Sequence, residues 1–92
     1  MMEDEAFRIP IEGTLDLHAF EPRDIPSVVD EYLNEAHDAG LEAVRLVHGR
    51  GVGVQRARVH QVLASHPLVA SFTDAPESHL GATIARLRPR RA

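Results

Sequence analysis

The sequence predicts a single α/β domain, and three observations lead to this fold class. The chain has 92 residues, which is enough for one hydrophobic core but not for two. Segments with the strand period of two alternate with segments of helical period, in the order β-α-β-α-β-β. Hydrophobic residues make up 43% of the chain, and no apolar run approaches the roughly 18 residues that a membrane span needs. We therefore expect a soluble domain with no membrane partner.

The first strand and the first helix have clear sequence signals. In residues 13–18, the period of two places Asp16 and His18 on one face of a strand and two leucines on the other. Residues 24–40 carry apolar side chains at helical spacing, with Asp24 as the expected N-cap and a terminal glycine as the stop. The side chains of Asp16 and His18 should therefore point to the same face just before the first helix.

The remaining elements follow from composition and from chain breakers. Residues 42–48 form a short apolar run bounded by glycines, which is typical of a buried strand. A second helix is expected from about Val54 until Pro67. Two further strands are expected at 68–75 and 81–87, separated by a turn-rich segment.

The domain is expected to span residues 13–87. An N-terminal arm, residues 1–12, precedes it, and a basic tail, residues 88–92, follows Leu87. The start of the chain carries acids where a secretory signal would be positive, and cysteine is absent, so we expect a cytoplasmic protein. After the helices are assigned no clear exposed apolar stripe remains, so the sequence gives no oligomeric state and a monomer is the default.

Topology brings the polar residues together. A β-α-β unit joins parallel strands by a right-handed crossover, so the carboxyl ends of its two strands lie side by side. His18 and His48 occupy those ends, and open α/β sheets bind ligands there. The sequence therefore predicts one site that contains Asp16, both histidines and the glycines after His48.

The glycine segment "HGRGVG" does not match a standard nucleotide-binding loop. Its spacing is G-x-G-x-G, whereas the dinucleotide fingerprint needs G-x-G-x-x-G, and a P-loop needs a lysine that the chain lacks. A strand that runs through glycines into a helix still leaves backbone N–H groups available to an anion. We expect phosphate to bind at Gly49, Arg50, Gly51 and Gly53, and the alternative is that the glycines only allow a tight turn.

The pair Asp16 and His18, with His48 nearby, is open to two chemical interpretations. An imidazole titrates near pH 6.5 and a carboxylate can orient it, so the three groups could do acid–base work on a phosphodiester. They also resemble a set of metal ligands with two histidines and one carboxylate, for which Mg²⁺ or Mn²⁺ would be the cofactor. We expect the other four histidines, at positions 37, 60, 66 and 79, to be ordinary solvated residues.

Charge is divided along the chain. The net charge is −4, but residues 1–42 hold twelve acids and two arginines, whereas residues 43–92 hold eight arginines and two acids. All ten basic residues are arginine, whose planar fork suits bidentate contact with phosphate. This division suits a nucleic-acid partner, and codon bias in a GC-rich genome is the alternative explanation.

Longer stretches resemble a known family. The segments "LDLHAF", "AHDAGLEAVRLVHGRGVG", "VHQVLASHPLVASF" and "GATIARL" occur in the order found in the small MutS-related, or Smr, domain. The resemblance covers about residues 13–87. It implies a two-layer α+β sandwich with βαβαββ order and a mixed four-stranded sheet whose last strand is antiparallel, similar to the C-terminal domain of translation initiation factor 3.

The resemblance also implies a function. Members of the family bind nucleic acid, and many are endonucleases, some with a divalent metal. The family's Asp-x-His motif falls on Asp16 and His18, and its His-Gly-x-Gly motif falls on residues 48–51. Ala19 departs from the glycine or threonine usual after "LDLH", and the usual glycine pair ahead of Gly81 is missing.

Two functions therefore stay open. One is an endonuclease that cuts phosphodiester bonds in RNA or in structured or single-stranded DNA, with Asp16, His18 and His48 as catalytic residues. The other is a nucleic-acid-binding module without catalysis. The residues expected to contact the nucleic acid in either case are Arg45, Arg56, Arg58, Thr83 and Arg88.

Overall fold

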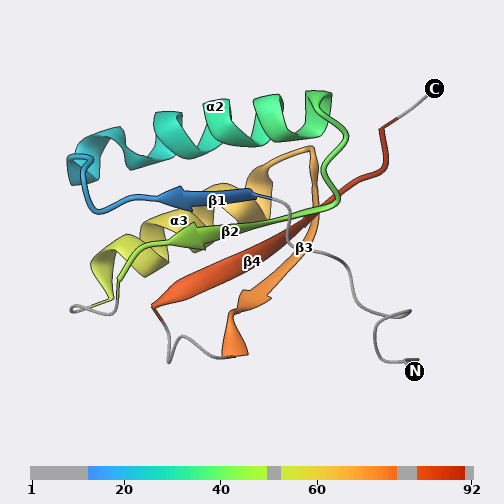
Figure 1. The fold of residues 1–92 in the computed structure, drawn as a ribbon. Helices are drawn as coiled ribbons and strands as arrows, with labels where there is room; N and C mark the ends of the chain where they lie inside the picture. Colours follow the sequence, from blue (N-terminus) through green and yellow to red (C-terminus); the bar gives the residue numbers. More distant parts are fainter. Residues whose placement is uncertain (1–12, 50–52, 77–80, 91–92) are drawn as a thin grey trace.

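Four strands form one mixed sheet, and two helices lie against one of its faces (Figure 1). The computed structural model describes residues 13–49, 53–76 and 81–90. Its elements are, in order, β1 (Gly13–Asp16), the 3-10 turn η1 (Pro22–Asp24), α2 (Ile25–Asp38), β2 (Ala43–Val47), α3 (Val54–Ser65), β3 (Val69–Asp74) and β4 (Ala82–Leu87). The predicted α/β class and βαβαββ order are confirmed, with η1 as an addition.

The sheet order is β1-β2-β4-β3. β1 and β2 are parallel, with Asp16 beside Val47 at their carboxyl ends, and α2 is the crossover between them. β4 runs antiparallel to both β2 and β3 and separates them. The mixed sheet with an antiparallel last strand is thus confirmed, and it places the residues that follow β1 and β2 at one edge of the molecule.

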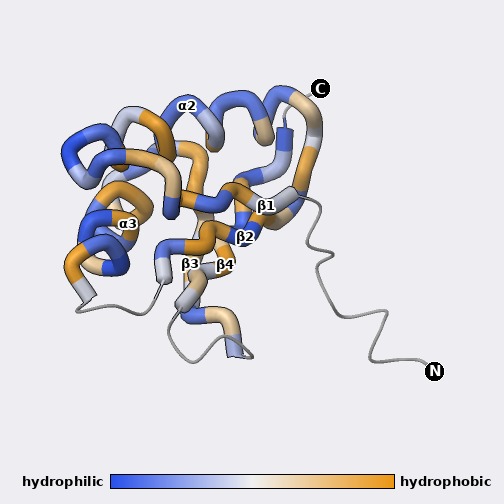
Figure 2. The backbone as a smooth tube through the Cα atoms, turned by 60° about the vertical axis from the view of Figure 1, so that its left-hand side comes forward, coloured by the Kyte–Doolittle hydropathy of each residue, from blue (hydrophilic) through white to orange (hydrophobic). Residues whose placement is uncertain are grey.

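The hydrophobic core lies between the sheet and the two helices. In Figure 2, hydrophobic segments of the tube occur in both of these layers. α2 and α3 contact each other and each contributes a buried stripe to this layer. The fully buried large side chains of the core are Leu17, Ile25, Val29, Leu33, Val44, Leu46, Val59 and Leu63. Burial of these side chains, rather than helix propensity, holds the two layers together.

The ends of α2 show where local sequence rules hold. Asp24 occupies the predicted N-cap position, but its side chain makes no capping hydrogen bond and its carbonyl accepts one from the Ser27 hydroxyl at 3.2 Å. Gly40 has φ +82°, the left-handed conformation that ends a helix, and so confirms the predicted stop.

Some predictions lie outside the described residues. These are the N-terminal arm, the loop positions Arg50 and Gly51, His79, and the end of the basic tail. Among the described residues, no helix is long and apolar enough to cross a membrane.

Candidate active site

Asp16 and His18 form an exposed pair at the carboxyl end of β1. Asp16 Oδ1 accepts a hydrogen bond from the His18 backbone N–H at 2.9 Å and lies 2.7 Å from His18 Nδ1. These bonds, the backbone one first, hold the pKa of the Asp16 carboxyl below its usual range. Because an ionised carboxylate can only accept, Nδ1 carries the ring proton. His18 Nε2 is left as the nitrogen able to exchange a proton.

The exposure of this pair matters as much as its geometry. The His18 and Asp16 side chains are 64% and 65% exposed, so a substrate can reach both. Within the described residues, Asp16 is the one hydrogen-bond partner of the His18 ring. Both bonds from His18 go to Oδ1, so neither uses the second carboxylate oxygen, Oδ2.

Gly49 brings the glycine loop into contact with this pair. It has φ +81°, and a Cβ built on it would lie 3.0 Å from His18 Nε2. The backbone N–H groups of His48 and Gly49 both donate to the Gly81 carbonyl, at 3.1 and 2.9 Å. The predicted convergence of His18 and Gly49 is therefore present, and the loop approaches the imidazole at a residue that has no side chain.

His48 faces the interior rather than the substrate side. It is 3% exposed, its Nε2 lies 2.9 Å from Thr83 Oγ1, and its Nδ1 lies 3.0 Å from the Gly49 carbonyl oxygen. Both ring nitrogens are thus occupied by the protein. Thr83, expected to contact nucleic acid, is completely buried, and its hydroxyl serves the histidines instead.

A third histidine joins this interior group. His60 Nε2 lies 2.9 Å from the same Thr83 hydroxyl, and its ring stacks on Phe72 at a centroid distance of 5.0 Å. The expectation that His60 is an ordinary solvated residue is wrong, because its helix face packs on β3 and β4 and leaves the side chain 27% exposed. The same expectation is wrong for His66, whose side chain is 5% exposed and whose Nε2 lies 2.7 Å from Asp30 Oδ1.

Arg56 and Asp74 complete the group. Arg56 Nε and one terminal nitrogen bind the two Asp74 carboxylate oxygens at 2.9 and 2.7 Å, which holds the pKa of the Asp74 carboxyl below its usual range. Arg56, expected to follow the nucleic acid, is therefore engaged within the protein. The sequence contained a signal for this group. Arg56 and His60 are four residues apart and so lie on one face of the helix with Val59, and Phe72 and Asp74 are two residues apart and so lie on one face of a strand.

The described residues do not assemble a complete metal site. No group of three or more histidine, aspartate or glutamate side chains among them is arranged to hold an ion. The set of Asp16, His18 and His48 fails because the His48 nitrogens point at Thr83 and Gly49. A metal held by Asp16 would need further ligands beyond those that the described residues bring together.

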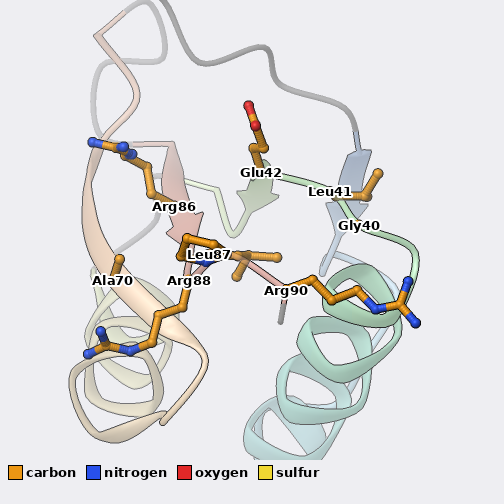
Figure 3. A pocket seen from close by; sticks show the side chains of 9 residues that line it. Gly40, Leu41, Glu42, Ala70, Arg86, Leu87, Arg88 and Arg90 are labelled. Atoms are coloured by element: carbon orange, nitrogen blue, oxygen red, sulfur yellow. The ribbon is translucent and has the colours of Figure 1, made fainter. Parts of the chain in front are cut away.

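The other described arginines that the sequence predicts to contact nucleic acid do not gather at one place. Arg58 is exposed on α3, and Arg88 lies at the far end of β4, where its Nε donates to the Pro67 carbonyl at 3.0 Å. A pocket of about 280 Å³ at that end is lined by Arg86, Arg88 and Arg90, whose side chains extend in different directions (Figure 3). Arg45 pairs with Ile84 across the sheet, on strand positions that alternate with the core residues. The basic surface is therefore spread out.

The fold and the site define a two-layer βαβαββ domain with an Asp-x-His pair packed against a His-Gly loop. Residues 15–88 match the family model of the Smr domain, and the chain belongs to this family.

Several proteins called endonuclease MutS2 are similar in sequence to this chain. The chain is 41% identical over 80 residues to the endonuclease MutS2 of Brevibacillus brevis and 45% identical over 62 residues to that of Caldicellulosiruptor saccharolyticus. These matches cover 85% and 65% of this chain but only 10% and 8% of the two relatives. The chain is thus homologous to the Smr domain of these proteins and spans about a tenth of their length.

Solved structures agree with this assignment. The crystal structure of the Smr domain of Thermus thermophilus MutS2 matches with a TM-score of 0.80 and 35% identity, covering 85% of this chain and all of that one. YdaL, a stand-alone small MutS-related protein from Escherichia coli, matches with a TM-score of 0.78 over 91% of this chain and 70% of its own. At 23% identity, YdaL supports the fold alone.

Proposed function

We propose that the protein is an endonuclease that cuts phosphodiester bonds in RNA or in structured or single-stranded DNA. The observation that carries this proposal is the exposed His18 ring, whose Nδ1 is held by ionised Asp16 and whose Nε2 lies against Gly49. A carboxylate that fixes the tautomer of an accessible imidazole is an arrangement suited to acid–base catalysis. Homology to the Smr domain of MutS2 endonucleases supports the same reaction class.

In this proposal His18 Nε2 exchanges the proton, as general base toward the attacking hydroxyl or as general acid toward the leaving oxygen. The loop backbone from Gly49 to Gly53, with Arg50 and Gly51, holds the phosphate. Gly53 has φ +86° and caps α3, so the N–H groups of the first turn of that helix point toward the loop. Such donors offset the charge that develops on the phosphate oxygens.

In this proposal a divalent ion would be held by Asp16 together with the substrate. Mg²⁺ is commonly bound by one or two carboxylates together with substrate phosphates, and Asp16 offers an ionised, exposed carboxylate whose Oδ2 is not used by His18. When bound there, Mg²⁺ or Mn²⁺ would neutralise charge on the phosphate.

Cleavage of labelled RNA and of labelled single-stranded and structured DNA tests the proposal, with Mg²⁺, with Mn²⁺ and with chelator. His18→Ala should lower the cleavage rate by roughly 100-fold to 10,000-fold while changing affinity much less. Asp16→Asn should also lower it, because the ring loses its ionised partner. His37→Ala, on α2, is the matched control and should cleave normally. Unchanged cleavage by His18→Ala would refute the role of His18.

A second candidate function is favoured by the burial of His48. With both His48 nitrogens engaged inside the protein, His18 is the one exposed imidazole that the described residues place at this site, whereas acid–base cleavage by two histidines needs two. This favours a nucleic-acid-binding module without turnover. Retained binding with no product under any of the metal conditions would select this function over the endonuclease.

Salt dependence tests what both functions share. Binding through phosphate contacts should weaken steeply as salt rises. A flat response would contradict both functions and favour a domain that binds protein.

A further inference from the structure

The buried Thr83 hydroxyl lies between two imidazoles and can satisfy them in only a few ways. His48 Nε2 and His60 Nε2 are each 2.9 Å from Thr83 Oγ1. The hydroxyl has one proton, so it can donate to one ring while its oxygen accepts from the other. Any other arrangement leaves a buried polar group unpaired, at a cost of about 1–3 kcal/mol.

The carbonyl of Gly49 decides the direction. It lies 3.0 Å from His48 Nδ1 and can only accept, so Nδ1 must carry a proton. In neutral His48 the other nitrogen, Nε2, is then bare and accepts the proton of the Thr83 hydroxyl. The Thr83 oxygen must in turn accept a hydrogen bond from His60 Nε2–H.

The surroundings of His60 favour a proton on the nitrogen that this order requires. Asp74 Oδ1 lies 3.6 Å from His60 Nε2, and Arg56 fixes that carboxylate by two hydrogen bonds. Phe72 stacks on the ring and restricts its rotation. The carboxylate thus favours a donor at Nε2, and the stacking keeps this nitrogen directed at Thr83.

We propose that His60 is a positioning residue: through the Thr83 hydroxyl it reinforces the Nδ1–H tautomer of His48 that the Gly49 carbonyl also favours, and His48 thereby fixes the Gly49 peptide beside His18. The relay, defined as His60, Thr83 and His48, joins α3, β4 and the loop after β2. The positions of the protons in the relay, on His48 Nδ1 and on His60 Nε2, are inferred from geometry alone. Only the effect of the relay on cleavage rests on the proposed function.

Nitrogen NMR of the histidine rings tests the relay in the intact protein. In the wild type, His48 should be protonated at Nδ1 and His60 at Nε2. His60→Phe keeps a ring against Phe72 but removes the donor, and Thr83→Val removes the hydroxyl. Both should increase the fraction of His48 protonated at Nε2.

Two conservative variants and one control separate the relay from general destabilisation. His60→Gln offers an amide N–H near the position of Nε2, and Thr83→Ser keeps the hydroxyl, so both should restore the His48 tautomer. Val62→Ala removes a half-buried side chain from the same helix without touching the relay, and it should leave the tautomer unchanged.

Each outcome decides a different point. A wild-type His48 protonated at Nε2, or a tautomer that survives both His60→Phe and Thr83→Val, overturns the relay. If the tautomer responds and the wild type cuts nucleic acid, these two variants should cut up to about 100-fold more slowly, because misplacement of about 1 Å can cost that much. Normal cleavage by both would remove the link to His18. A responsive tautomer in a protein that cuts nothing would refute the proposed function and leave the relay standing.

Discussion

At the residue scale, Gly49 meets two separate demands. Its φ of +81° belongs to the left-handed region, which costs other residues about 1–2 kcal/mol, and its α-carbon lies where a side chain would collide with His18. Gly40 has nearly the same φ, +82°, but a Cβ there would meet nothing within 4 Å. A comparison of substitutions at the two glycines can therefore distinguish the effect of backbone strain, which both share, from the effect of contact with His18, which only Gly49 has.

We expect Gly49→Ala and Gly40→Ala to lower the free energy of unfolding by a similar amount, about 1–2 kcal/mol each. Only Gly49→Ala should also slow cleavage, because the exposed His18 ring can move aside and lose its place at the loop. Urea unfolding and the cleavage assay measure the two effects. Equal cleavage by both variants would show that contact between Gly49 and His18 has no catalytic consequence.

The sequence could predict the residues whose position follows from topology. Asp16, His18 and Gly49 lie at the ends of two parallel strands, so chain order alone brought them together. It could not predict that His48 turns inward, because that depends on Thr83, 35 residues away on a strand whose place in the sheet came from family resemblance. His60 was misjudged for the same reason: its partners lie on β3 and β4.

At the element scale, α3 presents two arginines with different environments. Arg56 points at β3 and is held by Asp74, whereas Arg58 is exposed and lines a shallow surface with Val54 and Gln61. The ion pair therefore joins α3 to the edge strand of the sheet. An arginine on this helix can stabilise the fold, as Arg56 does, or stay available to a ligand, as Arg58 does. The exposure of the side chain distinguishes the two cases.

We expect Arg56→Ala to lower the free energy of unfolding, because it removes both hydrogen bonds of the bidentate, partly exposed ion pair with Asp74. It should leave the salt dependence of nucleic-acid binding nearly unchanged. Arg58→Ala should do the reverse and reduce the slope of log affinity against log salt by about 0.7 for a single strand. Affinity titrations over a salt series, with thermal unfolding of each variant, test the pair. A shallower slope for Arg56→Ala would contradict its assignment to the fold.

At the scale of the whole molecule, the interior polar group couples stability to pH. Burial first, and then the charge of Arg56 and the proximity of His48, lower the pKa of the His60 ring below its ordinary value of 6.5, against the opposing effect of Asp74. Between the lowered pKa and 6.5 the unfolded chain binds more protons at this residue than the folded one. His60 therefore contributes stability that is present above pH 6.5 and is lost as pH falls through the folded pKa.

We expect the wild type to lose free energy of unfolding relative to His60→Gln between about pH 7.5 and about pH 5.5, because the glutamine has no proton to gain. Urea unfolding at the two pH values measures this difference. Asp74 does not confuse the comparison, because its lowered pKa places its titration well below this window. An equal loss in both proteins would show that His60 is not linked to folding.

The place of β4 between β2 and β3 has a consequence for synthesis of the protein. This strand supplies Thr83, the carbonyl of Gly81 just before it holds the loop after β2, and it forms the connection through which β3 joins the sheet. Gly81 and β4 are translated after the pair Asp16 and His18, after the loop that follows β2, and after both helices. A nascent domain therefore carries Asp16 and His18 without the support that aligns them until β4 has left the ribosome. For a protein proposed to cut RNA, this order of assembly delays activity until every other described element of the domain has been made.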